Sequence, residues 1–341
     1  MMPVVTAFNR RTVAPLELEG ASAVIDASHM RSLAQTLPRV ARAFAHKRFS
    51  RSISSARASM PSEVPTFSFD AEQAEYYERV LARCFRPWTE VLFDISRPVR
   101  GESIIDIACG TGVVAIECAR AVSASGKVLA VDNAPGMLSM ARAKPSEQDA
   151  AVISWLEADA QTMTVPIASF DRAYCQQGLQ FMPDSASALK KTLKSLKPGG
   201  ALACSIWTPA TEKSNVVIYH LGQALMEIGR ARWFDVAMKP MSWTTTTEAK
   251  GRLKLEDALA SAGFINPDVA IENGTFEFDT IDEAVKIAKV APYGKELASD
   301  PELWRAFAEN FARRLAPYVR ADGRVVAPAR SFVGHGVAPW N

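Results

Sequence analysis

The sequence predicts an α/β protein in which a doubly wound, mostly parallel sheet carries helices on both faces. Short apolar, β-branched runs alternate with helical patterns along most of the chain, and this alternation requires a parallel sheet. The run at residues 103–108 leads straight into Gly110 and Gly112, and a helical pattern begins at Val113. A strand, a glycine loop and a helix N-terminus in succession can hold a polar or anionic ligand.

The remaining elements follow in order. A helix is expected over residues 71–86, ahead of the first strand. The expected strands are 103–108, 128–131, 153–156, 170–175, 201–207, 269–278 and 324–336. Asp184 is suited to cap the helix that ends before Pro198. Later helices are expected over 255–262, 280–290 and 301–316. Ligands of such sheets bind beyond the carboxyl ends of the strands.

The glycine loop does not fit the dinucleotide pattern. Asp132 ends the second strand, where an acid can accept hydrogen bonds from both hydroxyls of an adenosine ribose. A dinucleotide site needs Gly-x-Gly-x-x-Gly, whereas the run here begins at Ala108 and has no third glycine after Gly112. NAD and FAD are therefore disfavoured.

The chain resembles the class I S-adenosylmethionine-dependent methyltransferases, in particular their small-molecule, methyltransferase type 11-like subgroup. The resemblance rests on motifs that occur in the family's order between residues 70 and 210: 106–112, 131–132, 157–160, 170–184 and 196–200. It implies a Rossmann-like sheet of seven strands, with the last strand antiparallel at the sheet edge. It also implies S-adenosyl-L-methionine as the cofactor.

The resemblance assigns roles around the glycine loop. Gly110 and Gly112 let the backbone approach the methionine part of the cofactor, and Ala108 stands where the family has its first loop glycine. Asp106 is oriented toward the cofactor's ammonium group, and the carbonyl of Gln176 receives the same group. Alternatively, Asp106 is an acidic loop residue whose carboxylate only caps nearby backbone N–H groups.

The resemblance also assigns contacts to the adenosine part. The residues concerned are Asp132, Asn133, Met137, Asp159, Ala160 and Tyr77. Asp132 holds the ribose hydroxyls, Asp159 accepts from the adenine amino group, and the backbone N–H of Ala160 donates to the ring. Met137 and Leu138 cover the adenine or belong to ordinary helix core. Asp159, like Asp106, can also be read as a loop cap.

Residues 208–250 break the alternation. An apolar helix over 216–228 and the aromatic residues after it predict a cap that offers apolar surface to a small organic acceptor, or else aromatic core packed under a loop. His220 and Tyr76 are expected to line the acceptor site, with Tyr219 and Tyr77 as further candidates for a base. A lone histidine is also commonly packed or solvated. A base is needed only where the acceptor must lose a proton.

Charge and composition divide the chain. Residues 27–62 hold seven basic residues and no acid, which predicts a basic extension over residues 1–65 that is disordered or serves as a transit peptide. The expected core spans 66–207, the cap 208–250, and the rest of the core, with a helical insertion, 251–341. The protein is expected inside the cell, cytoplasmic or mitochondrial, since its five cysteines form no Cys-x-x-Cys pair.

The expected partner is a small-molecule acceptor. The mildly acidic remainder of the chain argues against nucleic acid, no apolar run is long enough to span a membrane, and the four scattered histidines predict no metal site. A monomer or a homodimer is expected. The predicted function is O- or N-methylation of a small organic molecule in a biosynthetic or secondary-metabolite pathway. The alternatives are a quinone C-methyltransferase of ubiquinone-type biosynthesis and a non-catalytic S-adenosylmethionine-binding subunit.

Overall fold

The computed structural model describes residues 69–238 and 247–340, which belong to the unit Glu63–Asn341. The extension predicted over residues 1–65 lies outside the described residues, as do residues 239–246 of the predicted cap. No helix in the described part is long and apolar enough to cross a membrane.

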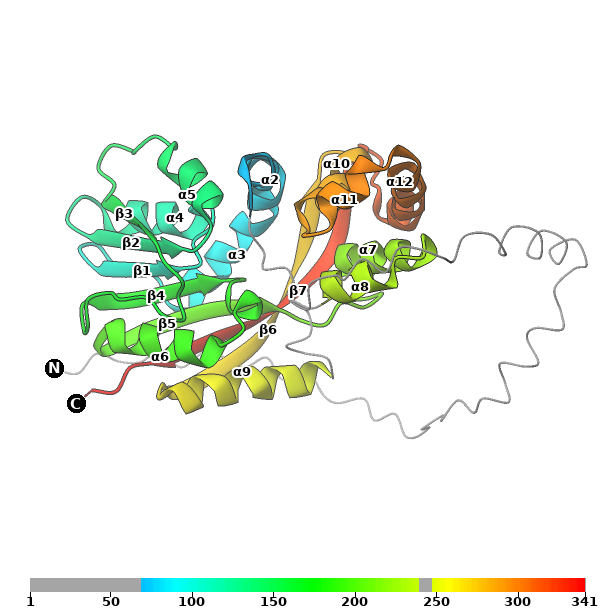
Figure 1. Ribbon diagram of the computed structural model, residues 1–341. Helices are drawn as coiled ribbons and strands as arrows, with labels where there is room; N and C mark the ends of the chain where they lie inside the picture. The colour runs from blue at the N-terminus through cyan, green and yellow to red at the C-terminus, as the bar shows by residue number, and fades with distance from the viewer. Residues whose placement is uncertain (1–68, 239–246, 341) are drawn as a thin grey trace, which may run out of the picture. The chain divides into compact units, whose positions relative to one another are not determined.

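The sheet has seven strands in the order β3-β2-β1-β4-β5-β7-β6 (Figure 1). The strands are β1 Ser103–Ile107, β2 Lys127–Asp132, β3 Val152–Glu157, β4 Phe170–Gln176, β5 Leu196–Trp207, β6 Ile265–Phe278 and β7 Val325–Val337. The first five run parallel, and β7 is antiparallel to both β5 and β6. The predicted fold class is confirmed. The chain reverses its strand order between β1 and β4, where ligands of such sheets bind.

The predicted place of the last strand is wrong. β7 lies between β5 and β6, and β6 is the edge strand. Phe332 and Val333 are neighbours on β7 and point to opposite faces, yet neither is more than 1% exposed. Phe332 and Val333 lie in the apolar cores on opposite faces of the sheet, and such burial on both faces is typical of a central strand.

Two helical layers cover the sheet. α3 (Ala82–Ile95), α4 (Val113–Val122) and α5 (Pro135–Arg142) share one apolar core with it. α6 (Ser185–Ser195) and α9 (Glu248–Ala262) share the other. Since α9 starts at Glu248, residues 248–250 belong to a helix of the core and not to the predicted cap.

The first helix is longer than predicted. α2 (Ala71–Tyr76) passes through a π-helical turn, η2 (Tyr77–Leu81), into α3, which runs past the expected end at residue 86. Pro87 lies inside α3 and costs about 3 kcal/mol, because it lacks an N–H group and crowds the preceding turn. Trp88 and Leu92 are buried on the same helix, and burial of about 2 kcal/mol each offsets that cost.

A third group of helices gathers where β6 and β7 extend beyond the parallel strands (Figure 1). Its members are α7 (Val216–Glu227), α8 (Ala231–Met238), α10 (Ile281–Val285), η5 (Lys286–Val290), α11 (Gly294–Ser299) and α12 (Pro301–Leu315). They share one buried apolar cluster with the strands beneath them. The described part of the predicted cap therefore forms a single helical layer with the predicted C-terminal insertion. The sequence predicted no helix or strand between residues 290 and 301, where the structure has the short helix α11.

Candidate functional site

The loop after β1 is built from residues in the left-handed backbone region. Ala108 has φ +55°, Gly110 +54° and Gly112 +85°, and Gly112 directly precedes α4. A Cβ atom on Gly112 would lie 2.6 Å from a ring carbon of Trp155 on β3. Glycine at 112 is therefore required both by the backbone angle and by the tryptophan ring.

Asp132 joins the end of β2 to this loop. Its two carboxylate oxygens accept hydrogen bonds from the backbone N–H groups of Gly110 and Ala134, each at 2.8 Å. Burial raises the pKa of Asp132. Each carboxylate oxygen can accept more than one hydrogen bond, so both retain capacity for hydroxyl donors of a ligand.

Asp106 lies beneath the loop on β1. The residue is 1% exposed, and its Oδ2 atom has no hydrogen-bond partner in the described structure. Burial raises the pKa of Asp106 well above its ordinary value, although the backbone N–H of Ala115 opposes this shift. A buried carboxyl group with one unsatisfied oxygen is costly, and a donor from a ligand or water would relieve it.

Tyr77 lies on the other side of the loop. A Cβ atom on Gly110 would be 3.9 Å from the Tyr77 hydroxyl, so the tyrosine faces this glycine across a small space. Burial raises the pKa of Tyr77, and the charge of Asp132 raises it further. The hydroxyl is therefore neutral at physiological pH. Tyr77 can donate a hydrogen bond and exclude water, but it is not placed to act as a base.

Tyr77 begins a chain of aromatic rings that leads away from the loop. We call Tyr77, Phe85, Trp88, Trp207 and Phe276 the aromatic wall. The ring centroids of Tyr77 and Phe85 are 5.7 Å apart, and those of Phe85 and Trp207 are also 5.7 Å apart. Trp207 lies 5.4 Å from Trp88 and 5.1 Å from Phe276. Trp88, Trp207 and Phe276 are buried in the apolar core, at 2%, 4% and 1% exposure, whereas Tyr77 and Phe85 are only partly buried. The wall can therefore present the Tyr77 and Phe85 rings to a flat apolar ligand, with the other three rings packed behind them.

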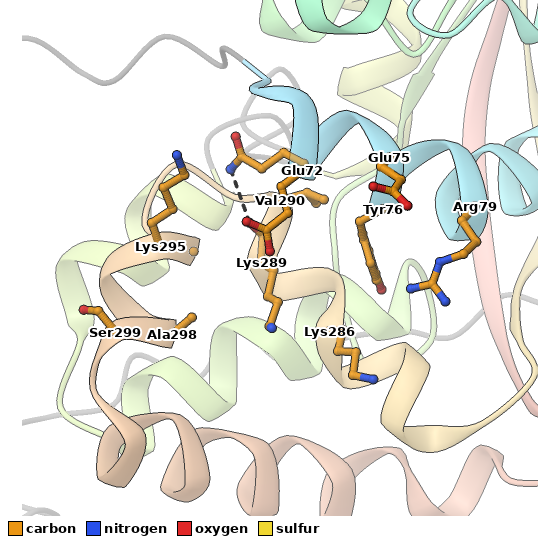
Figure 2. Close-up of a pocket in the computed structure, with 12 residues that line it drawn as sticks. Glu72, Glu75, Tyr76, Arg79, Lys286, Lys289, Val290, Lys295, Ala298 and Ser299 are labelled. Atoms are coloured by element: carbon orange, nitrogen blue, oxygen red, sulfur yellow. Dashed lines mark hydrogen bonds between the residues drawn. The ribbon is translucent and has the colours of Figure 1, made fainter. Parts of the chain in front are cut away.

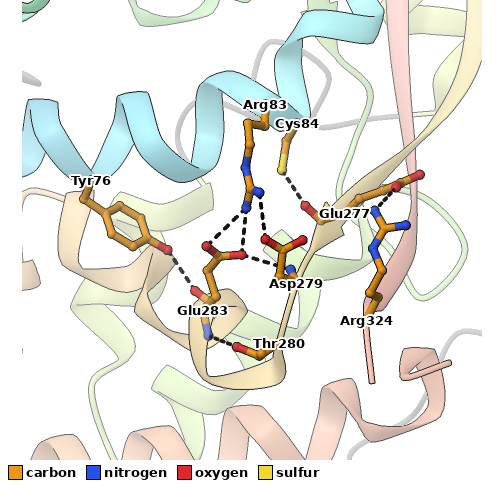
Figure 3. A network of polar contacts seen from close by, with 8 residues as sticks. All are labelled: Tyr76, Arg83, Cys84, Glu277, Asp279, Thr280, Glu283 and Arg324. Carbon is orange, nitrogen blue, oxygen red and sulfur yellow. Dashed lines mark hydrogen bonds and ion pairs between the residues drawn. The ribbon is translucent and has the colours of Figure 1, made fainter. Parts of the chain in front are cut away.

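A polar network fixes the helix that carries Tyr77 to the connection between β6 and α10 (Figure 3). Arg83 pairs with Asp279 at 2.7 Å and with Glu283 at 3.0 Å. The Tyr76 hydroxyl donates to the backbone carbonyl of Glu283 at 2.8 Å, and the Cys84 thiol donates to that of Glu277 at 3.1 Å. These contacts determine where Tyr77 and Phe85 lie over the loop.

The segment after β4 abuts the glycine loop from the neighbouring strand. A Cβ atom on Gly178 would lie 2.6 Å from the Cβ of Ala108. The Gln176 side chain donates to the backbone carbonyl of Phe85 at 3.0 Å and accepts from Thr89 at 3.1 Å. Gln176 thereby anchors α3 to β4, beside the point where the strand order reverses.

Two further glutamines of this segment are buried. Gln177 has φ +54°, and its Nε2 donates to Ser331 at 2.7 Å, while its Oε1 has no partner in the described structure. Gln180 accepts from the backbone N–H of Trp207 at 2.8 Å, and its Nε2 is likewise unpartnered among the described residues. Both side chains carry unmet hydrogen-bonding capacity at the carboxyl ends of β4 and β5.

Comparison with known proteins agrees with this geometry. A sequence model described as the ubiE/COQ5 methyltransferase family matches residues 77–230. Aklanonic acid methyltransferase DauC of Streptomyces sp. (strain C5) is 36% identical over 138 residues, which cover 40% of this chain and 62% of that protein. Demethylmenaquinone methyltransferase of Listeria welshimeri serovar 6b is 27% identical over 179 residues, 52% of this chain and 76% of that protein. These matches support an S-adenosylmethionine-dependent methyltransferase.

A solved structure supports the fold of this methyltransferase. Phosphoethanolamine N-methyltransferase 2 of Haemonchus contortus, in complex with phosphomonomethylethanolamine and S-adenosylhomocysteine, superposes with a TM-score of 0.51. The identity is 16%, and the superposition covers 82% of this chain and 61% of that one. At this level of identity the likeness concerns the fold alone.

The cradle of the methyltransferase fits S-adenosylmethionine. A Cβ atom on Gly110 would lie in van der Waals contact with the Tyr77 hydroxyl at 3.9 Å, so glycine keeps the backbone bare beside the tyrosine. Asp132 retains acceptor capacity, and the unsatisfied oxygen of Asp106 calls for a donor. The cofactor bears an ammonium group and two ribose hydroxyls, which are donors of the required kind.

The other residues expected at the adenosine part lie around this cradle. Asp159 accepts hydrogen bonds from the backbone N–H of Gln161 at 2.8 Å and from its side-chain amide at 2.9 Å. Part of the acceptor capacity of its carboxylate is therefore used within the protein. Ala160 is buried and Asn133 is exposed. Met137 is 3% exposed and packs in a small cluster with Ala74, against which Tyr77 also packs. Leu138 is 0% exposed and belongs to the core beneath α4 and α5, which agrees with the alternative interpretation of this residue as ordinary helix core.

The two residues expected at the acceptor are occupied by other contacts. The ring of His220 on α7 packs against Tyr219 and Tyr318, with centroids 5.2 and 5.9 Å away, and burial and Arg314 lower its pKa. No described contact joins His220 to the glycine loop. Tyr76 is buried, and its hydroxyl serves the network with Glu283.

The aromatic residues of the predicted cap fall into two groups. Trp233 is 9% exposed and stacks on Tyr293 at 5.4 Å between centroids, so it packs in the shared apolar cluster. That placement agrees with the alternative interpretation, aromatic core packing. Met241 and Trp243 lie outside the described residues.

Sequence reasoning missed several residues that shape the site. Phe85 and Arg83 lie on one helix, and only the fold brings them to their distant partners, Trp207 and Asp279 respectively. Gln177 and Gln180 stand in the motif at 170–184, and two polar residues next to an apolar strand end were a signal that could have singled them out.

Replacing Ala108 with glycine tests the strain in the loop. Ala108 adopts φ +55°, which costs a residue with a side chain about 1 kcal/mol or more. Glycine removes this cost but adds unfolded-state entropy of similar size. We expect Ala108→Gly to change the free energy of unfolding by no more than about 1 kcal/mol, toward greater stability, and to retain S-adenosylmethionine binding. Urea unfolding and calorimetry measure both. A loss of stability above that size would show that the Ala108 methyl group makes an essential contact with Gly178.

Proposed function

We propose that this methyltransferase transfers the methyl group of S-adenosylmethionine to the oxygen of an ionised carboxylate or enol on a flat, largely apolar organic acceptor. The observation that carries the proposal is the aromatic wall, which starts at the Tyr77 ring beside Gly110 and continues to Trp207 and Phe276. The acceptors named in the relatives, aklanonic acid and demethylmenaquinone, are small organic molecules, which is consistent with such a surface.

The acceptor oxygen is inferred from the titratable groups beside the loop. Burial raises the pKa values of Tyr77 and Cys109, so both keep their protons near neutral pH. Asp106 is 1% exposed beneath the loop, which shields its carboxyl group from an acceptor. Asp132 is held by two backbone N–H groups. Among the described residues around the loop there is thus no group suited to deprotonate an alcohol or an ammonium. A carboxylate or an acidic enol needs no such base, because it is already ionised.

The protein's own contribution is then positioning and the exclusion of water. When bound, the cofactor would supply an electrophilic methyl group, which passes to the acceptor oxygen as the bond from sulfur to the methyl carbon breaks and S-adenosylhomocysteine leaves. Gly110 and Gly112 keep the backbone close to the donor, and Asp132 holds its ribose. Tyr77 shields the site, and Phe85, which packs on the buried Trp207, orients the acceptor ring so that its ionised oxygen faces the methyl group.

Methylation of a ring carbon in a quinol is the second candidate. The match to the ubiE/COQ5 model and to demethylmenaquinone methyltransferase favours it. A quinol carbon becomes nucleophilic only when a neighbouring hydroxyl loses its proton. This candidate therefore requires a base from outside the loop residues considered above.

A substrate panel tests the proposal. The purified protein is titrated with S-adenosylmethionine by calorimetry and then incubated with aromatic carboxylic acids, acidic enols, naphthoquinols and amines of similar size. We expect binding of the cofactor and transfer to the acids or enols. The position of the new methyl group is read by mass spectrometry and NMR, which separate an ester or enol ether from a C-methyl product.

Two variants sharpen the result. Phe85→Ala removes a ring of the wall and should raise KM for the acceptor with little effect on cofactor affinity. His220→Ala should leave kcat/KM within about threefold, since its ring contacts are with Tyr219 and Tyr318. Cofactor binding with no transfer to any class would favour the non-catalytic alternative, and transfer to amines alone would contradict the proposal.

A further inference from the structure

A cavity lies between the first helix and the segment that carries Lys286, Lys289 and Lys295 (Figure 2). Its volume is about 570 Å³, a size suited to a small metabolite. One wall is formed by residues of α2 and η2 and the other by residues of η5 and α11. Gln73 spans the two walls, because its Nε2 donates to the backbone carbonyl of Lys289 at 3.2 Å.

The lining carries more positive than negative charge. Its cations are Arg79, Lys286, Lys289 and Lys295, and its carboxylates are Glu72 and Glu75. Lys295 forms an ion pair with Asp70, and the ammonium of Lys289 lies 5.3 Å from the ring centroid of Trp304. Neither Arg79 nor Lys286 has an acidic partner within hydrogen-bond distance among the described residues.

Arg79 and Lys286 are exposed at the opening of the cavity, where water screens their repulsion, and an anion bound between them would reduce it further. Tyr76 and Arg79 extend from the upper helix toward the segment that carries Lys286 and Lys289, so the basic groups come from both walls (Figure 2). The two carboxylates keep the excess charge small. They favour a compact ligand with one or two negative charges over a polyanion.

The cavity is separate from the methyl-donor cradle. Consecutive residues of a helix point in directions about 100° apart, and Tyr76 lines the cavity while Tyr77 faces Gly110. On the same helix Ala74 packs against α5 together with Met137. The helix therefore lies between the two spaces, with one face toward each.

We propose that this cavity is a second binding site, for a small metabolite that carries a carboxylate or phosphate group, with Arg79 and Lys286 as its principal contacts. The site is independent of which acceptor is methylated. Cationic side chains bind carboxylate and phosphate groups in the same way, so the experiment below tests the two groups separately.

The full-length protein is titrated with inorganic phosphate and, separately, with succinate at constant ionic strength, and binding is followed by calorimetry and by protein NMR shifts. We expect saturable binding of at least one probe. The double variant Arg79→Gln/Lys286→Gln should weaken that binding by about tenfold or more. Preference for phosphate indicates a phosphorylated ligand, and preference for succinate indicates a carboxylated one.

A matched control changes the same charges elsewhere. Lys190 and Arg320 are exposed and lie outside the cavity, so Lys190→Gln/Arg320→Gln should bind the probe like the wild type. Thermal unfolding confirms that each variant is folded, and Lys286→Gln alone replaces the double variant if that one unfolds. Absence of saturable binding by either probe, or equal loss in test and control variants, would overturn the proposal.

Discussion

Gly112→Ala is expected to cause the largest loss of stability among single changes in the glycine loop. The new methyl group would meet the Trp155 ring at 2.6 Å, and the backbone angle of +85° is unfavourable for alanine. Strain of about 1–2 kcal/mol from the angle and about 1–3 kcal/mol from overpacking together lower the free energy of unfolding by about 2–5 kcal/mol. Urea unfolding measures this loss. Calorimetry should show S-adenosylmethionine affinity reduced by about tenfold or more, because the loop must shift.

Gly323 offers a matched control for the backbone term. It has the same φ of +85°, but a Cβ atom added there would meet no heavy atom within 4 Å. Gly323→Ala should therefore cost only about 1–2 kcal/mol and leave cofactor binding unchanged. Equal losses of stability in the two variants would mean that the Trp155 contact contributes nothing and that the backbone angle alone makes glycine necessary at 112.

Asp132→Asn is expected to have the largest effect on cofactor binding. The substitution keeps the size of the side chain but removes its charge and one of its two acceptors, which now serve Gly110 and Ala134. A charged acceptor for hydroxyl groups contributes about 1.5–3 kcal/mol, so affinity for S-adenosylmethionine should fall by about ten- to a hundredfold. Calorimetry with S-adenosylhomocysteine gives the same comparison without turnover.

The pH dependence of this residue has opposite signs for stability and for binding. Burial raises the folded-state pKa of Asp132 above its unfolded value. Its contribution to stability is therefore full below the unfolded pKa and is lost as the pH rises through the folded pKa. Cofactor binding needs the ionised carboxylate, so affinity should fall as the pH decreases through the raised pKa. In Asp132→Asn this acid-side fall should be absent.

Asp184→Asn serves as the control for Asp132→Asn. Asp184 is an exposed carboxylate that caps α6 by accepting from the backbone N–H of Ser187 at 3.0 Å. Its loss should reduce stability slightly and leave cofactor affinity and its pH dependence intact. An Asp132→Asn protein that bound the cofactor like the wild type would show that Asp132 only supports the loop.

The sequence predicted the strands of the parallel sheet well because each is a short apolar run with a clear boundary. All five expected parallel strands overlap those observed, and the glycine loop stands where it was expected. Local signals were less reliable where tertiary contacts oppose them. The helix was expected to end at residue 86, but it continues through Pro87, since burial of Trp88 and Leu92 offsets the cost of the proline.

The sequence alone therefore determined the fold class and the position of the glycine loop, since Asp106 and Asp132 lie at the ends of β1 and β2, and Gly110 and Gly112 follow β1. Their roles toward the cofactor stay predictions. Only the tertiary structure placed β7 inside the sheet, gave His220 its partners on the far helices, and brought Tyr77, Phe85 and Trp207 into one wall. Such contacts join residues that are distant along the chain. They depend on how apolar faces pack against one another, which no local pattern encodes.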